Sequence, residues 1–272
     1  MKKIAFVILT CQSEPYLEAC LNSVCALAGF QVQIYLVDNG SSDGTRGIIE
    51  RMEAMLPATV RLHRTYLDKN YGTTYPRNLA LRQIRDVDYI CILDSDTVIN
   101  GDAVKTMAAY LDEHAECGIV GPQMADRTGK LQMSARRCPA LADKILKAIP
   151  LDICQRWGEA LEAMPDTSAD TVYAGYLLSA CWLLRPALLQ TCGFLDEHIF
   201  YAPEDAEYCI RVWKSGSTVV LHRRAQILHH WQRLSRKKRF SALNYQHIRG
   251  LLYLFRKHHC FFKPFDICPY VC

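Results

Sequence analysis

Two aspartates stand one residue apart at the end of an apolar stretch. The segment YICILDSDTV, residues 89–98, is apolar as far as Leu93 and then places Asp94 and Asp96 on either side of Ser95. Two such carboxylates can hold Mg²⁺ or Mn²⁺ through oxygen ligands and leave positions open for the phosphates of a substrate. The pair therefore indicates a metal site, although a solvated turn with Asp94 capping the following helix has the same pattern.

The elements before and after this pair indicate an α/β fold. Apolar stretches typical of buried strands alternate with amphipathic stretches typical of helices. The strands are predicted at 2–9, 31–39, 60–65 and 88–93, and the helices at 13–27 (with Ser13 as N-cap), 46–56, 74–84 and 101–114. This alternation predicts a mostly parallel sheet flanked by helices on both faces. In such sheets ligands bind at the carboxyl ends of the strands, where Asp38 and the Asp94/Asp96 pair lie.

The second half of the chain has a looser pattern. Residues 133–170 look irregular or partly helical, and an apolar segment follows at 171–185. Short helices are predicted at 186–193 and 203–216, the second beginning at its acids. We divide the chain into a main domain, 1–221, and a basic C-terminal helical segment, 222–272, that completes the site.

Composition limits the classes of protein. The chain has 272 residues, of which 50% are hydrophobic and 22% charged, so it can bury a core. It contains no apolar run near the roughly 18 residues of a membrane span, and its first residues do not resemble a signal peptide, so we expect a cytoplasmic protein. Thirteen scattered cysteines are typical of a reducing compartment. A zinc site formed by residues 258–260, 268 and 272 would have a spacing that matches no established ligand pattern.

Five motifs occur in one order along the chain. They are IYLVDNGSSDGT, YPRNLAL, YICILDSDT, GYLLSACWLLRPALLQTCGFLDEHIFYAPEDAEYCIRVWKSG and ILHHW. Together they resemble glycosyltransferase family 2, over roughly residues 3–257. The resemblance implies a Rossmann-like GT-A fold and an inverting transfer of a sugar from a nucleoside-diphosphate sugar, linked to UDP or dTDP, to a hydroxyl of a glycan or lipid-linked acceptor.

The resemblance also implies which residues bind the nucleotide. Asp38 would hold the base and ribose, with Thr10 close by, and Arg77 and Asn78 would line the diphosphate side. Asn39 stands where many members of the family have a second acid, which leaves the base unassigned. A guanidinium at position 77 can pair with phosphate through parallel hydrogen bonds.

The resemblance also assigns the metal ligands and the catalytic general base. Asp96 would bind Mg²⁺ or Mn²⁺ directly, and Asp94 would bind ribose or reach the metal through water. One of His229 and His230 would complete the metal site, and we assign His229. Asp205 would act as general base on the acceptor hydroxyl. We therefore expect residues 38, 96 and 205 to share one cleft.

Four further residues are predicted on the acceptor side or just behind the site. Glu204 precedes the base, and Asp196 and Glu197 resemble a motif that the family places near the acceptor. Trp182 could offer its ring to a sugar, although a tryptophan in an apolar segment is more often part of the core.

The C-terminal end is strongly basic. From His222 onward, eleven Lys and Arg face a single acid, Asp266, and aromatic residues lie among them at near-helical spacing. Such a segment is typical of peripheral contact with an anionic membrane, and acidic glycans or a partner subunit would suit it too; we do not expect nucleic acid. Two other functions remain open, a sugar-phosphate nucleotidyltransferase and a non-catalytic sugar-binding relative. The first would be expected to carry a Gly-rich phosphate loop after the first strand, where this chain has TCQSEPYLEA.

Overall fold

A computed structural model describes residues 1–149, 151–164, 168–230 and 242–267. The strands are β1 (Lys2–Thr10), β2 (Phe30–Asp38), β3 (Val60–Tyr66), β4 (Tyr89–Asp94), β5 (Thr97–Val98), β6 (Cys117–Ala125), β7 (Ala135–Arg136), β8 (Thr171–Tyr173), β9 (Tyr176–Leu177), β10 (Cys181–Leu184) and β11 (Thr218–His229). The helices are α1 (Leu17–Cys25), α2 (Thr45–Ala54), α3 (Thr74–Leu81), α4 (Gly101–Glu113), α5 (Leu141–Ala148), α6 (Asp152–Glu162), α7 (Ala187–Cys192), α8 (Glu204–Lys214) and α9 (Ala242–His258).

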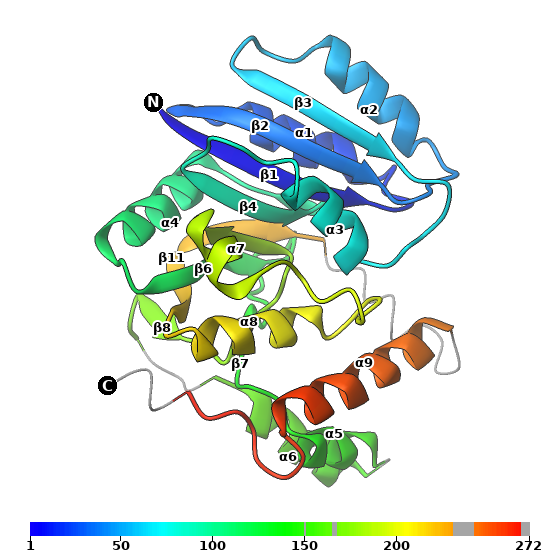
Figure 1. The fold of residues 1–272 in the computed structure, drawn as a ribbon, viewed down its shortest axis with the longest axis vertical. Coiled ribbons are helices and arrows are strands. Elements are labelled where there is room, and N and C mark those ends of the chain that lie inside the picture. The colour runs from blue at the N-terminus through cyan, green and yellow to red at the C-terminus, as the bar shows by residue number, and fades with distance from the viewer. Residues whose placement is uncertain (150, 165–167, 231–241, 268–272) are drawn as a thin grey trace.

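One large sheet runs through the molecule in the order β3-β2-β1-β4-β10-β6-β11-β5, with β8 also paired to β11 (Figure 1). The pairings among β3, β2, β1 and β4 and between β6 and β11 are parallel. The sheet is mostly parallel, as predicted, with three antiparallel members: β10 runs antiparallel to both β4 and β6, and the short strands β5 and β8 run antiparallel to β11. Opposite Thr10 lies Asp38, and opposite Leu9 lies Asp94, so the ends of three parallel strands meet at one edge.

The alternation of side chains along each strand divides the core into two layers. On β1, Ile4, Phe6 and Ile8 face α1, α2 and α4, whereas Ala5 and Val7 face the layer that contains α3, α7 and α8. Successive residues of a strand point to opposite faces, so a continuous apolar run is what a sheet covered on both sides requires. The predicted α/β fold with helices on both faces is confirmed.

Three details differ from the expectations. The first helix begins at Leu17 rather than just after Ser13; in the turn before it, the Ser13 carbonyl accepts hydrogen bonds from the N–H groups of Tyr16 and Leu17. Within the stretch expected to be irregular or partly helical, α5 and α6 form a well-defined helical pair. The boundary placed after residue 221 falls inside β11, so it does not divide the sheet.

The C-terminal segment is only partly helical where it is described: residues 222–229 belong to β11, Ala242–His258 form α9, and residues 260–267 are not helical. Part of the basic stretch, residues 231–241, lies outside the described residues, as do Cys268 and Cys272 of the zinc alternative. No helix among the described residues is long and apolar enough to cross a membrane. The eleven described cysteines are all free thiols.

Candidate active site

A cleft of about 300 Å³ opens where β1 and β4 end. The charged or titratable side chains that line it, apart from Cys11 and Tyr201, are Arg77, Asp94, Asp96, Glu204, Asp205 and His229. A larger hollow of about 590 Å³ adjoins it at His229 and His230, and another of about 490 Å³ lies near Lys3 and Pro186. The smallest of the three is the one that brings the predicted metal ligands and the predicted base together, so we take it as the candidate active site.

Asp94, Asp96 and His229 form a cluster that could hold a metal ion. One ligand atom from each lies within 4.8 Å of the others. The Nδ1 of His229 is 2.8 Å from Oε1 of Gln132, an atom that can only accept, so Nδ1 carries the proton and Nε2 is left as the ligand atom. That Nε2 faces Asp96 Oδ1 at 3.5 Å. Fixing one ring nitrogen by a hydrogen bond is how metal-binding histidines are commonly oriented.

His230 faces elsewhere. Its ring stacks on Tyr16 and its Nδ1 accepts a hydrogen bond from Nε of Arg127, while its backbone N–H donates to the Asp96 carbonyl. The geometry therefore favours His229, as assigned from the sequence. Two carboxylates and a neutral imidazole fit Mg²⁺ or Mn²⁺, since these ions accept oxygen ligands and Mn²⁺ accepts imidazole readily.

Arg77 ties the metal cluster to the start of α8. Its Nη2 donates to Asp94 Oδ1 at 2.5 Å, and its Nη1 donates to Glu204 Oε1 at 3.1 Å and to Ser179 Oγ at 3.2 Å. The side chain is 2% exposed. Because both terminal nitrogens already meet protein oxygens, the structure uses Arg77 to position two carboxylates rather than as an open phosphate ligand.

Burial raises the pKa of three carboxyl groups in this cleft. It raises the pKa of Glu204 to about 7, with the neighbouring charge of Asp205 adding to the effect and Arg77 opposing it. Burial also raises the pKa of Asp94, opposed by Arg77 and reinforced by Asp96. The pKa of Asp205 is raised by burial too, although its Oδ1 accepts the Ala206 N–H at 2.8 Å, which favours the charged form. A carboxylate made more basic in this way suits proton abstraction.

Comparison with known proteins decides the family. A family model described as Glycosyl transferase family 2 matches residues 5–160, more than half of the chain. The chain belongs to glycosyltransferase family 2. It is accordingly a glycosyltransferase with a GT-A fold.

Individual relatives agree with this family. The N-acetylglucosaminyl-diphospho-decaprenol L-rhamnosyltransferase of Mycobacterium tuberculosis is 26% identical over 266 residues, which cover 93% of this chain and 84% of that protein. The S. aureus TarS 1-349 structure with UDP-GlcNAc superimposes with a TM-score of 0.60 at 19% identity, covering 94% of this chain and 65% of that one. A mannosyltransferase from Pyrobaculum calidifontis, solved with GDP-Man and Mn²⁺, gives a TM-score of 0.63 at 14% identity, covering 97% and 66%.

In this glycosyltransferase the residues predicted to hold the nucleotide base lie beside the cleft rather than in it. Asp38 is fully buried, and its Oδ2 accepts a hydrogen bond from Nε of Arg46 at 2.6 Å while Oδ1 accepts from Thr10 Oγ1 and the Ser41 N–H. The expectation that residues 38, 96 and 205 share one cleft was therefore wrong for residue 38. Asp38 and Thr10 remain neighbours of Cys11, which does line the cleft.

The two predicted asparagines hold loops. The amide nitrogen of Asn39 donates to the Gly72 carbonyl at 2.7 Å, and its Oδ1 accepts the Tyr71 N–H. Asn78 donates to the Leu195 carbonyl at 2.9 Å and to Glu197 at 2.8 Å. Both are buried and neither lines the cleft, so in this structure they shape its walls.

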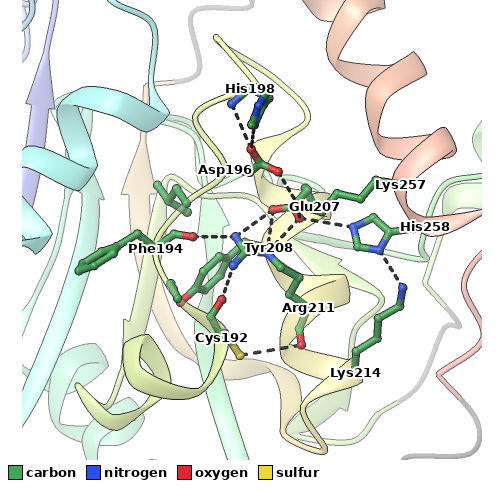
Figure 2. A network of polar contacts seen from close by, with 12 residues as sticks. Cys192, Phe194, Asp196, His198, Glu207, Tyr208, Arg211, Lys214, Lys257 and His258 are labelled. Carbon is green, nitrogen blue, oxygen red and sulfur yellow. Dashed lines mark hydrogen bonds and ion pairs between the residues drawn. The ribbon is translucent and has the colours of Figure 1, made fainter.

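Two residues predicted on the acceptor side have other partners. Trp182 is fully buried on β10 and stacks on Tyr208, so it has no exposed ring for a sugar and the core interpretation holds. Asp196 accepts hydrogen bonds from Lys257 Nζ at 2.5 Å and Tyr253 Oη at 2.7 Å. Figure 2 shows Asp196 in a polar network with side chains of α8 and α9, among them Glu207 and Lys257.

That network joins the last turn of α9 to α8. Glu207, fully buried three residues after the start of α8, accepts from Lys257 Nζ at 2.7 Å and pairs with Arg211 at 2.9 Å (Figure 2). His258 Nε2 lies 3.4 Å from the same carboxylate. The contacts fix the helix that begins with Glu204 and Asp205.

Sequence reasoning missed several supporting polar residues. Ser179 bonds both Arg77 and Glu204, Gln132 orients His229, and Ser13 and Ser95 share a hydrogen bond of 2.8 Å beside the aspartate pair. Ser179 could have been found, because it is a polar residue inside the apolar GYLLSAC stretch. Gln132 lies in a stretch without a periodic pattern, and nothing in the sequence marks it.

Proposed function

We propose that this glycosyltransferase moves a sugar, with inversion, from a nucleoside-diphosphate sugar to a hydroxyl of a lipid-linked saccharide. The observation that carries the proposal is the cleft in which a two-carboxylate, one-imidazole cluster faces Asp205. The acceptor class is supported by the mycobacterial relative, whose name describes a diphospho-decaprenol substrate and which aligns along most of both chains. A UDP- or dTDP-linked donor, Mg²⁺ or Mn²⁺, and a cytoplasmic site of action complete the proposal.

The residues of the cleft divide the reaction between them. Asp205 takes the proton of the acceptor hydroxyl as its oxygen bonds to the anomeric carbon and the bond from that carbon to the diphosphate breaks. Asp94, Asp96 and His229 would hold the divalent cation, which when bound offsets the negative charge on the leaving diphosphate. Arg77 keeps Asp94 and Glu204 in place, and Asp38 with Thr10 supports the wall nearest the nucleotide.

The test is replacement of the proposed base. Asp205→Asn keeps the size of the side chain and removes its basicity, so we expect sugar transfer to fall by roughly 10²–10⁴-fold while donor binding persists. Mass spectrometry of a polyprenyl-diphosphate-linked acceptor, incubated with nucleotide sugars and Mn²⁺, would detect the added sugar. Asp102→Asn, which changes an exposed acid in the first turn of α4, is the matched control. Transfer by Asp205→Asn at the level of this control would remove Asp205 as the base.

A further inference from the structure

Helix α6 presents its apolar side to solvent. Ile153, Trp157 and Leu161 are four residues apart and so follow one face of the helix, and they are 66%, 64% and 43% exposed. The residues that α6 buries are Gly158 and Glu162. The usual arrangement, with an apolar face on the core and a polar face in water, is reversed here.

A buried cluster of charges allows this reversal. The Glu162 carboxylate accepts from Arg136 at 2.9 Å and Lys147 at 2.9 Å, and it also pairs with Lys144 at 2.5 Å. Three cations around one carboxylate tie α6 to α5 and β7. The apolar face of α6 therefore remains exposed in the folded protein.

Helix α9 has a similar outer stripe. Tyr245, Ile248 and Leu252 are 63%, 56% and 54% exposed, and Arg249 and Arg256 are exposed on the same side of the helix. The opposite side of α9 is buried, through Leu254 and Phe255.

These stripes belong to one region of the molecule. Helices α5, α6 and α9 gather at one end of the fold, away from the strand edge β3 (Figure 1). The backbone just after α9 bonds to the start of α5, where Leu141 and Ala142 donate to the carbonyls of Cys260 and Phe261. Ten of the sixteen exposed large hydrophobic side chains of the described residues lie between 145 and 161 or between 245 and 262. A concentration of this kind marks an interaction surface.

We propose that this outer apolar surface, formed by residues 153, 157 and 161 of α6 and 245, 248 and 252 of α9, docks on an anionic lipid bilayer. Cations accompany the apolar residues, namely Arg156 on α6 and the two arginines on α9. An amphipathic surface with interspersed Arg and exposed Trp and Tyr is what binds the boundary between headgroups and acyl chains.

The same charges argue against a second copy of this chain as the occupant. In a symmetric dimer a patch meets itself, so these arginines would face one another. The cores of protein interfaces are also depleted of charged side chains relative to the rest of the surface. A bilayer with anionic headgroups meets the apolar residues and the cations together.

The position of the surface relative to the cleft fits a lipid-linked acceptor. Gly250 of α9 lies against Ala202 and Pro203, the residues immediately before Glu204 and Asp205. A bilayer on the outer side of α9 would thus lie close to the base. This orientation rests on the proposed function, whereas binding to vesicles is independent of it.

The experiment is flotation of the full chain with vesicles, without any nucleotide sugar. We expect the protein to float with phosphatidylcholine vesicles that contain phosphatidylglycerol and to float much less with phosphatidylcholine alone. Measured in a Trp231→Phe background, the fluorescence of Trp157 should shift to shorter wavelength and be quenched by brominated lipids, since the other two tryptophans, Trp182 and Trp213, are fully buried. A wild-type protein that stays at the bottom of the gradient with anionic vesicles would overturn the proposal.

Matched variants locate the surface. Replacing two exposed apolar residues, in the variant Ile153→Ser/Trp157→Ser, should weaken partitioning by about tenfold or more. Met55→Ser is the control, since Met55 on the far side of the fold is as exposed as Ile153, at 66%. Equal partitioning of the two variants would contradict the assignment. Light scattering gives a second test: a dimer that forms as the concentration rises, and that is lost in the double variant but not in Met55→Ser, would also contradict it. Melting temperatures would check that both variants fold.

Discussion

At the scale of single residues, Arg77 is the centre of the site's electrostatics. It is almost wholly buried between Asp94, beside the proposed metal, and Glu204, beside the proposed base. A buried cation that joins two carboxylates fixes their separation, and each carboxylate in turn depends on it for charge compensation. Both ends of the reaction, the leaving group and the proton acceptor, are thereby connected through one guanidinium.

We predict that Arg77→Met destabilises the fold by about 3 to 5 kcal/mol, because it leaves two buried carboxylates without their partner. Urea denaturation followed by circular dichroism measures this loss. Arg82→Met on the same helical segment is the control: Arg82 pairs with Glu197 at 2.7 Å but is 46% exposed, so its loss should change stability by less than about 1 kcal/mol. Equal effects of the two substitutions would show that Arg77 does not hold the site together.

The residues that do chemistry could be predicted from the sequence better than their partners. Asp94, Asp96, Glu204 and Asp205 stand at strand or helix ends, and such ends converge at one edge of the sheet. Which carboxylates pair with Arg77, and whether Asp38 opens to the cleft, depends on side-chain packing between separate segments, which for Arg77 and Glu204 are 127 residues apart. No local pattern encodes such distances.

At the scale of elements, Glu162 holds α6 in place by charge. Although burial opposes ionisation, the charges of Lys144 and Lys147 hold its pKa at about 2, below the ordinary value of 4.5. A carboxylate with a depressed pKa in the folded protein contributes stability above its unfolded pKa and loses it as pH falls. The window for this loss runs from about pH 4.5 down to about pH 2.

Glu162→Gln should therefore lower stability on the order of 3 kcal/mol at about pH 7, and the difference from wild type should shrink as the pH falls toward 3. Denaturation midpoints measured across this range give the comparison. Glu159→Gln changes an exposed acid on the same helix and should show no such trend. A constant gap between Glu162→Gln and wild type at every pH would mean that packing, and not charge, attaches α6.

The contact of α9 with the loop before α8 can be tested at Gly250. A Cβ at this position would lie 2.3 Å from the Ala202 carbonyl oxygen, so Gly250→Ala must displace either the helix or the loop. Alanine normally favours a helix by about 1 kcal/mol over glycine, yet here we expect a lower melting temperature and a lower kcat, because Asp205 follows that loop. At Gly101, on α4, a Cβ meets nothing within 4 Å, and Gly101→Ala should leave both quantities unchanged or raise stability. Should Gly250→Ala behave like Gly101→Ala, α9 does not position the base.

Strands and helices could be predicted from the sequence where their periodically spaced apolar residues are the ones that the fold buries. The strands β1 to β4 and the helices between them agree with their predicted ranges to within a few residues, since each buries the side chains that its period groups together. Residues 133–170 were predicted only as irregular or partly helical, because α6 buries the charged Glu162 and exposes Ile153, Trp157 and Leu161. The periodic signal was present, but it did not indicate which side faces the protein.

At the scale of the whole molecule, one edge of the sheet gathers the site from distant parts of the chain. The proposed metal ligands come from β4 and its following turn and from the end of β11, and the proposed base comes from the start of α8. The antiparallel strand β10 joins the parallel N-terminal part to β6 and β11. Through β11 the chain returns His229 to within reach of Asp96, more than a hundred residues earlier.

The central claim is that a divalent cation at Asp94, Asp96 and His229 binds the diphosphate of the donor. Electron paramagnetic resonance of Mn²⁺, titrated with the protein in the presence of uridine diphosphate, measures this binding directly. We predict nucleotide-dependent Mn²⁺ binding by the wild type, its loss in Asp96→Asn, and an affinity roughly 10 to 100-fold weaker in Gln132→Ala, which removes the hydrogen bond that orients His229. Unchanged Mn²⁺ binding in Asp96→Asn, or nucleotide binding that is equally tight in EDTA, would contradict it.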